Sequence, residues 1–210
     1  FITGLHGTYL LIDAANLYMR CLHSLPSDSP QLHDLYKQLV FTSLKCTMQK
    51  HANIDRVIFC QEGFHNWRKE YYKLYKANRA EGREASDIDF DAFFAMNNEF
   101  MSDFAAMAKN FQFLQVPECE ADDLIAVITK HYKNTNIICQ SSDKDFYQLY
   151  KYKNYKQWDG VKRKFIEVAN PETYLIEKII LGDSGDNVPR ISGLKYRQGP
   201  KFIERNILPS

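Results

Sequence analysis

Short apolar runs alternate along the chain with longer stretches in which apolar residues recur at helical spacing. Runs rich in β-branched and aromatic residues are typical of β-strands, and strands are predicted at Tyr9–Asp13, Arg56–Cys60, Phe111–Val116, Asn136–Ser141 and Lys164–Val168. Helices are predicted from the helical spacing at Leu32–Lys50, Trp67–Asn78, Phe90–Lys109, Ala121–Tyr132 and Pro171–Leu181. This alternation predicts an α/β fold with a mostly parallel central sheet flanked by helices.

Two stretches depart from this pattern. Residues 80–91 are polar and lack a strong period, which indicates a flexible connection or a segment that becomes ordered on a ligand. After Gly182 the chain is rich in Gly and Pro, and we predict two short helices around a hairpin bracketed by Gly193 and Gly199. With 210 residues, of which 45% are hydrophobic, the chain can build one sizeable core. Because no apolar stretch is long enough to span a bilayer, we expect no membrane partner.

Acidic residues collect where predicted strands end or predicted helices begin. They are Asp13, Glu120, Asp122, Asp123, Asp143, Asp145, Asp183 and Asp186, with Glu62 as a further candidate. In an open α/β sheet the carboxyl ends of the strands face one crevice. Crowded carboxylates repel one another unless cations neutralise them, and oxygen ligands suit Mg²⁺ or Mn²⁺. The pattern therefore predicts a divalent-metal site of the kind that serves phosphoryl transfer.

Each acidic cluster also has a structural interpretation, since acidic residues stabilise helix N-termini and Asp is common in turns. One cluster alone would favour that interpretation, whereas several clusters at element ends favour metal binding. The five cysteines include no CxxC pair and the histidines are scattered, which argues against a zinc site and fits a reducing compartment.

Aromatic and basic residues mix in the segment that precedes residue 80. Tyr72, Tyr75, Lys76 and Arg79 would share one face of the predicted helix. Cations beside a scissile phosphate stabilise the charge that develops there, and aromatic rings can stack unpaired bases. The alternative is a core-facing tyrosine stripe whose cations extend to water. The net charge is only +1, so an acidic pocket flanked by basic surface, rather than overall charge, indicates a polyanionic substrate.

Five motifs in this order resemble those of the 5′-nuclease or flap endonuclease superfamily: LLIDAAN, YKANR, CEADDLIA, SSDKDF and GDSGDNVP. The segments WRKEYYKLYKANR and KQW…KFIEV resemble the bacteriophage ribonuclease H branch of that superfamily. The resemblance runs from about Leu10 to Lys201, nearly the whole chain. It implies a nuclease domain over residues 1–181, with a helical arch at about 79–109, and the start of a helix–hairpin–helix element over residues 182–210.

The resemblance also implies a role for each candidate residue. The ligands of a first Mg²⁺ (or Mn²⁺) ion would be Asp13, Glu120, Asp122 and Asp143. The ligands of a second ion would be Asp145, Asp183 and Asp186, with Asp123 in reach of either ion. Glu62 stands where the family usually has Asp and would be a further ligand. Lys76 and Arg79 would be catalytic residues in contact with the scissile phosphate.

Nucleic-acid binding would fall to residues on both sides of this site. They are Arg68, Tyr72, Tyr75, Lys195, Arg197, Lys201 and Arg205. In the family the hairpin has two glycines separated by one residue and followed by Lys-Thr, and its backbone N–H groups hold duplex phosphates and a K⁺ ion. Here Leu194 to Gln198 separate the two glycines, so the phosphate nest and the K⁺ site depart from the family pattern.

We therefore predict a divalent-metal-dependent 5′-nuclease, a phosphodiester hydrolase that acts as 5′→3′ exonuclease and flap endonuclease in replication and primer removal. Its partners would be DNA with a 5′ flap or 5′ single-stranded end, an RNA–DNA hybrid, and replication proteins. We expect a cytoplasmic monomer, in the host cytoplasm if a phage encodes it. Two alternatives stay open: a nucleic-acid-binding module without activity, and a haloacid-dehalogenase-type phosphatase, although Asp13 is not followed by the DxD pattern that such a phosphatase needs.

Overall fold

The computed structural model describes residues 7–51, 53–79, 83, 86–107 and 109–192. The strands are β1 (Thr8–Asp13), β2 (Ile54–Gln61), β3 (Phe111–Gln115), β4 (Asn136–Gln140), β5 (Tyr155–Asp159) and β6 (Lys164–Phe165). The helices are α1 (Ala14–His23), α2 (Leu32–Lys50), α3 (Arg68–Tyr71), α5 (Phe90–Met107), α6 (Ala121–His131), the 3₁₀ helix η1 (Lys144–Lys151) and α7 (Pro171–Leu181). Among these described helices, none is both long and apolar enough to cross a membrane.

The strands form one six-stranded sheet in the order β3-β2-β1-β4-β5-β6. All neighbouring pairs are parallel except β5 and β6, which are antiparallel. The predicted α/β fold with a mostly parallel sheet is therefore confirmed. From β1 the chain adds β2 and β3 on one side and β4, β5 and β6 on the other. In open sheets of this kind, a crevice forms at the carboxyl ends of the strands where the strand order changes direction in this way.

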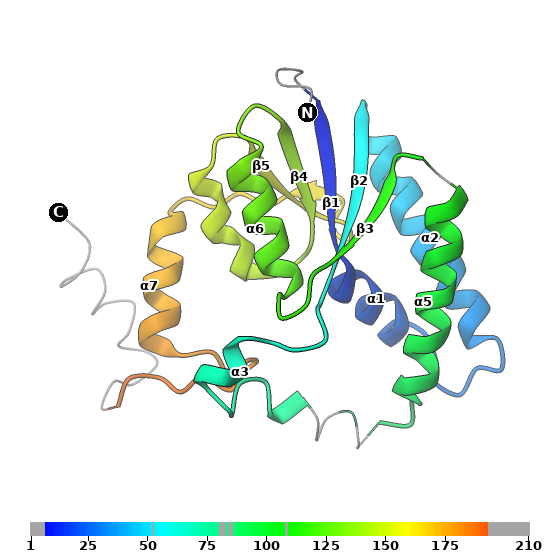
Figure 1. The fold of residues 1–210 in the computed structure, drawn as a ribbon, viewed down its shortest axis with the longest axis horizontal. Coiled ribbons are helices and arrows are strands. Elements are labelled where there is room, and N and C mark those ends of the chain that lie inside the picture. Colours follow the sequence, from blue (N-terminus) through cyan, green and yellow to red (C-terminus); the bar gives the residue numbers. More distant parts are fainter. Residues whose placement is uncertain (1–6, 52, 80–82, 84–85, 108, 193–210) are drawn as a thin grey trace.

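Alternating residues of β1 build a core on each face of this sheet. Leu10 and Ile12 pack against α1, α2 and α5, whereas Leu11 packs against α6 and η1. Figure 1 shows the two layers, with α2 and α5 side by side and α6 on the other side of the sheet. Because both faces are covered, the central strands are continuously apolar, as parallel strands must be.

Two predicted elements differ from the observed ones. The predicted helix Trp67–Asn78 is wrong, because only Arg68–Tyr71 is helical before the chain turns. The predicted strand Lys164–Val168 shrinks to the two residues of β6 at the sheet edge. The helix α1 and the strand β5 were not predicted. Residues 80–82, 84–85 and 193–210, which hold part of the polar stretch and the predicted hairpin, lie outside the described residues.

Candidate active site

The centre of the site lies where β1 and β4 end side by side. Asp13 ends β1 and caps α1 by accepting a hydrogen bond from the backbone N–H of Asn16. Ser141 follows β4, and its hydroxyl donates to Asp13 at 2.8 Å while accepting from the backbone N–H of Asp143 at 3.0 Å. The fully buried Ser141, which sequence reasoning did not single out, thus fixes Asp13 relative to Asp143.

Two more carboxylates enter from the first turn of α6. Glu120 caps this helix and is almost fully buried, and Asp122 follows two residues later in the first turn. Burial, reinforced by the charges of Asp13, Asp143 and Glu120, raises the pKa of Asp122 to about 8. Burial also raises the pKa of Asp13 to about 6. Burial is the main cause of both shifts, and the charges of neighbouring carboxylates add to it.

A second group of carboxylates comes from η1 and from the loop after α7. One oxygen each of Asp145, Asp183 and Asp186 lies within 4.8 Å of the others. The loop is closed by a bridge between Asp183 and Val188, and the backbone N–H of Gly185 donates to Asp183 at 2.9 Å. Carboxylates that converge in this way are the donor set expected of a magnesium or manganese site.

Lys178 of α7 joins two members of this group. Its ammonium contacts Asp145 and also lies 2.6 Å from Asp183. Although partial burial raises it, the hydrogen bond and charge of Lys178 bring the pKa of Asp183 below its usual value. The hydroxyl of Tyr174, one turn earlier on α7, donates to Asp145 at 3.2 Å.

Further cations reach the site from the segment 72–79. Lys76 pairs with Glu120, and Arg79 pairs with Asp186 at 2.9 Å. The Tyr75 hydroxyl lies 2.9 Å from Glu120 and 3.2 Å from Asp186. Burial and the two neighbouring carboxylates raise the Tyr75 pKa far above its usual value, so it stays a neutral donor. The structure therefore brings the predicted cations and one predicted tyrosine to the predicted carboxylates.

The backbone that carries these side chains is not the predicted helix. Lys76 has a φ of 54°, a left-handed conformation that interrupts a helix. Its backbone N–H donates to the carbonyl of Asp186, and the Asn187 side chain donates to the carbonyl of Leu74 at 2.8 Å. Tyr72 uses its hydroxyl to donate to the carbonyl of Asn187 at 3.0 Å. Contacts with the acidic loop therefore outweigh local helix preference in this segment.

Three predicted site residues have other partners. Arg68 makes a bidentate pair with Asp123, both distances being 2.8 Å, and lies 3.0 Å from Glu120. Asp123 also accepts from the backbone N–H of Glu120, which completes a capping box on α6. Glu62 lies 3.8 Å from Lys76 and 44% of its side chain is exposed. The predicted binding residues Lys195, Arg197, Lys201 and Arg205 lie outside the described residues.

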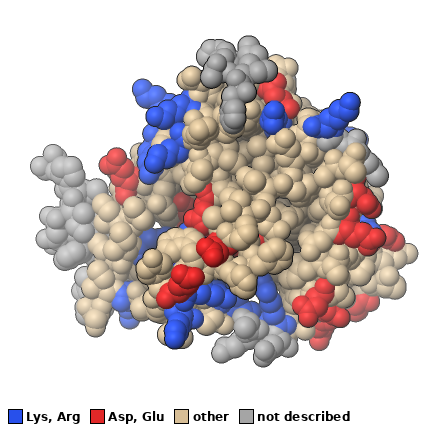
Figure 2. Space-filling view, viewed as in Figure 1, with Lys and Arg blue, Asp and Glu red and all other residues tan. Residues whose placement is uncertain are grey.

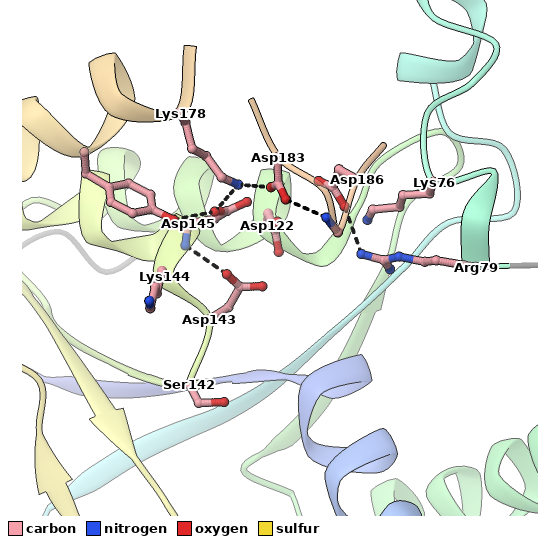
Figure 3. A pocket seen from close by; sticks show the side chains of 12 residues that line it. Lys76, Arg79, Asp122, Ser142, Asp143, Lys144, Asp145, Lys178, Asp183 and Asp186 are labelled. Carbon is pink, nitrogen blue, oxygen red and sulfur yellow. Dashed lines mark hydrogen bonds and ion pairs between the residues drawn. The ribbon is translucent and has the colours of Figure 1, made fainter. Parts of the chain in front are cut away.

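A cavity of about 370 Å³ opens between the carboxylates and the cations. Its lining includes Lys76, Arg79, Asp122, Asp143, Lys144, Asp145, Lys178, Asp183 and Asp186 (Figure 3). In Figure 2, Lys and Arg atoms gather around α3, next to acidic atoms. Sequence reasoning missed Tyr174 and Lys178, although their spacing of one helical turn just before GDSGDN was a usable signal.

The comparisons with known proteins agree with this arrangement. Residues 8–179 match the family described as 5'-3' exonuclease, N-terminal resolvase-like domain, and the chain belongs to that family. The ribonuclease H of enterobacteria phage T4 is 29% identical over 165 residues, which cover 75% of this chain and 54% of the phage protein. A flap endonuclease Xni of Shewanella sp. (strain W3-18-1) is 24% identical over 207 residues, which cover 92% of this chain and 71% of that protein.

DNA polymerase I of Rhizobium leguminosarum is 32% identical over 215 residues, which cover 92% of this chain but only 20% of the polymerase. The chain thus spans about half the length of the phage ribonuclease H and a fifth of the polymerase. The crystal structure of a bacteriophage T5 flap endonuclease with DNA and metal ions superposes with a TM-score of 0.71 at 20% identity, covering 97% of this chain and 80% of that one. At this identity the likeness shows a shared fold.

Proposed function

We propose that this chain is a divalent-metal-dependent, structure-specific 5′-nuclease, a 5′→3′ exonuclease and flap endonuclease that hydrolyses phosphodiester bonds in DNA and in RNA–DNA hybrids. The observation that carries the proposal is the convergence of two carboxylate groups and two cations, Lys76 and Arg79, on one cavity. The family supports it, as do relatives named ribonuclease H and flap endonuclease. A role in replication and primer removal follows from the same proposal, with replication proteins as partners.

The donor chemistry of the cavity fits two divalent ions. Asp13, Asp122 and Asp143, with Glu120 beside them, would hold one ion, and Asp145, Asp183 and Asp186 would hold the other. All these donors are carboxylate oxygens, which Mg²⁺ and Mn²⁺ prefer. When bound, such ions polarise a phosphoryl oxygen and lower the pKa of a water molecule, so that hydrolysis proceeds at neutral pH.

We assign Asp123 and Arg68 a structural role in this scheme. The Arg68 guanidinium pairs with the Asp123 carboxylate, and this pair stabilises the N-terminus of α6. Glu62 would act through Lys76 rather than as a ligand, since its side chain is exposed and lies 3.8 Å from that lysine. Lys76 itself is oriented by Glu120 toward the cavity. Its positive charge, with that of Arg79, would stabilise the charge that builds on the phosphate during cleavage.

The substrate would approach from the side of the segment 72–79. Residues 79–109 would form an arch around a 5′ single strand, with α5, which packs on the core through Phe93 and Met101, as its base. The segment 182–210 would hold the duplex through phosphate contacts that add affinity without sequence preference. Tyr72, whose hydroxyl is engaged with Asn187, would offer its ring rather than its hydroxyl to a base.

The test is cleavage of a 5′-labelled flap duplex and of an RNA–DNA hybrid in Mg²⁺, Mn²⁺, Ca²⁺ or EDTA. We expect cleavage in Mg²⁺ and Mn²⁺ and none in EDTA. Asp143→Asn should remove cleavage, whereas Asp34→Asn, at an exposed position of α2, should not. Binding of the flap without cleavage in any metal would instead favour a nucleic-acid-binding module without activity.

A further inference from the structure

The ammonium group of Lys178 lies inside the Asp145, Asp183 and Asp186 group. It contacts one oxygen of Asp145 and one oxygen of Asp183, and these two carboxylates face each other across it (Figure 3). The same carboxylates belong to the set whose oxygens come within 4.8 Å of one another. A protein cation therefore already lies where a divalent ion would have to bind.

The helix α7 holds this lysine in place. Lys178 follows Tyr174 by one helical turn, so both side chains point from α7 toward η1. The Tyr174 hydroxyl and the Lys178 ammonium contact the same oxygen of Asp145. Only 23% of the Lys178 side chain is exposed, so this lysine is a built part of the cavity rather than a surface side chain that happens to swing inward.

The three aspartates of the other group have no such ion-pair partner among the described residues. Within the part of the chain that the structure describes, no ion pair reaches Asp13, Asp122 or Asp143, whereas Asp145 and Asp183 both pair with Lys178. Lys76 approaches the first group but pairs with Glu120 and Glu62. The two groups therefore differ in where the resident ammonium lies: Lys178 contacts two of the three aspartates of its group, whereas Lys76 contacts Glu120 beside the three aspartates of the other group.

On the basis of the proposed nuclease function, we propose that Lys178 is a resident counterion that competes with the divalent ion for Asp145 and Asp183. An ion can bind these two oxygens only after the ammonium leaves them, because two cations repel each other at such close range. Lys178 thus sets the affinity of this group and makes it the weaker of the two ion sites. The first ion would bind at Asp13, Asp122 and Asp143, and the second only at higher concentration.

The experiment is direct titration of the whole, DNA-free chain with Mn²⁺, counting free Mn²⁺ by electron paramagnetic resonance. Wild type should bind one Mn²⁺ tightly and a second more weakly. Lys178→Met, which keeps the length of the side chain without its charge, should bind the second Mn²⁺ at least about tenfold more tightly and leave the first unchanged, since one ion-pair partner of each carboxylate is gone. Lys178→Gln serves as a second neutral variant if the Met variant does not fold.

Two matched variants complete the test. Lys144 lines the same cavity, and no ion pair involves it among the described residues, so Lys144→Met should change the affinity for either Mn²⁺ by less than about threefold. Lys178→Arg keeps the charge and should keep the second Mn²⁺ weak. Equal or weaker binding of the second Mn²⁺ in both neutral variants overturns the role of Lys178 while two-ion binding still stands. If wild type and variants bind no Mn²⁺ at all, both this role and the proposed metal-dependent function are wrong.

Discussion

The backbone N–H of Lys76 donates a hydrogen bond to the backbone carbonyl of Asp186 at 3.0 Å. One bond thereby joins the segment that carries Lys76 and Arg79 to the loop that carries Asp183 and Asp186. The same segment and loop are joined again by Asn187 and by Arg79. These bonds hold the segment with Lys76 and Arg79 against the loop with Asp183 and Asp186, so we expect a change in the loop to displace the two cations.

Removing one crowded carboxylate should abolish cleavage and stabilise the metal-free protein. Asp122→Asn replaces a carboxyl whose pKa is raised to about 8 by burial and by three neighbouring carboxylates, so folding no longer has to protonate this group or hold its charge among the others. We expect loss of flap cleavage by at least about 10³-fold, as for an essential group of a two-metal site, together with a higher Tm in EDTA. Thermal unfolding followed by circular dichroism measures the second effect. A lower Tm of the variant in EDTA would show that the Asp122 carboxylate stabilises the metal-free fold, contrary to this prediction.

The same shift predicts how metal-free stability depends on pH. A carboxyl whose folded-state pKa is raised binds its proton more tightly when folded, so it contributes stability at low pH that is lost as pH rises through the folded pKa. For Asp122 the loss runs from above the ordinary value of 3.8 to about 8, and for Asp13 from 3.8 to about 6. In EDTA we expect the free energy of unfolding to fall by on the order of 2 kcal/mol between pH 6 and pH 8, about 5 °C in Tm.

Two measurements test whether this pH dependence comes from the buried carboxyl groups. The Tm of Asp122→Asn should change much less over this range of pH, and saturating Mg²⁺ should flatten the wild-type profile, because the ion binds the ionised carboxylates. A wild-type Tm in EDTA that rises from pH 6 to pH 8 contradicts the assignment.

Lys76 is predicted to act on the transition state. Lys76→Ala should lower kcat and kcat/KM together by about 10²–10³-fold with KM little changed, as when one preorganised donor to a developing negative charge is removed. Glu120 keeps Arg68, Tyr75 and Asn66 as partners, so the fold should survive. Lys73→Ala, an exposed lysine of the same segment, is the control and should leave kcat unchanged. An effect on KM alone would make Lys76 a residue that positions phosphate.

Most of the sheet could be predicted because apolar runs in parallel strands are unambiguous, whereas β5 could not. Its sequence, YKQWD, is mostly polar, and Gln157 is fully buried because its amide donates to the carbonyls of Ser141 and Asp143. A polar residue whose amide N–H groups pair with distant backbone carbonyls cannot be distinguished from a surface residue by periodicity. The helix predicted over Trp67–Asn78 was wrong for a related reason, since the partners of Lys76 and Leu74 lie more than a hundred residues away in the chain.

The carboxylates of the site were predictable from their position after strands and before helices, because that position follows from the fold class. Their partners were less accessible to sequence reasoning. Arg68 was predicted to bind nucleic acid, and only the structure shows its bidentate pair with Asp123. Lys178 was overlooked because a lysine in an amphipathic helix usually faces water, and its direction depends on how α7 packs against η1.

Arg68 should therefore matter more to stability than to DNA affinity. Arg68→Ala leaves Asp123 and the almost fully buried Glu120 without their guanidinium partner. We expect the free energy of unfolding to fall by about 2 kcal/mol, which lowers Tm by about 6 °C. This is less than the effect of breaking a fully buried ion pair, because the arginine is partly exposed. Arg68→Lys should recover only part of it, since lysine cannot pair bidentately. A flap KM that rises tenfold with Tm unchanged would restore Arg68 as a residue that binds DNA.

The loop that carries Asp183 and Asp186 depends on Gly182, and this dependence gives the last prediction. Gly182 has a φ of +71°, and a Cβ there would lie 2.5 Å from the carbonyl oxygen of Val188. Gly182→Ala must therefore shift backbone on both sides of the bridge between Asp183 and Val188. We expect a loss of about 2 kcal/mol in the free energy of unfolding, measured by urea titration.

Because Lys76 is bonded to this loop through Asp186, the Gly182→Ala variant should also lose cleavage beyond what its lower stability explains, even at a temperature where it is fully folded. Gly185→Ala is the matched control in the same loop. A Cβ at Gly185 meets only the flexible side chain of Asp183, at 3.3 Å, so stability should change by less than about 0.5 kcal/mol. If Gly182→Ala cuts the flap as fast as wild type when folded, the geometry of this loop does not govern the reaction, and the coupling between Lys76 and Asp186 has no catalytic consequence.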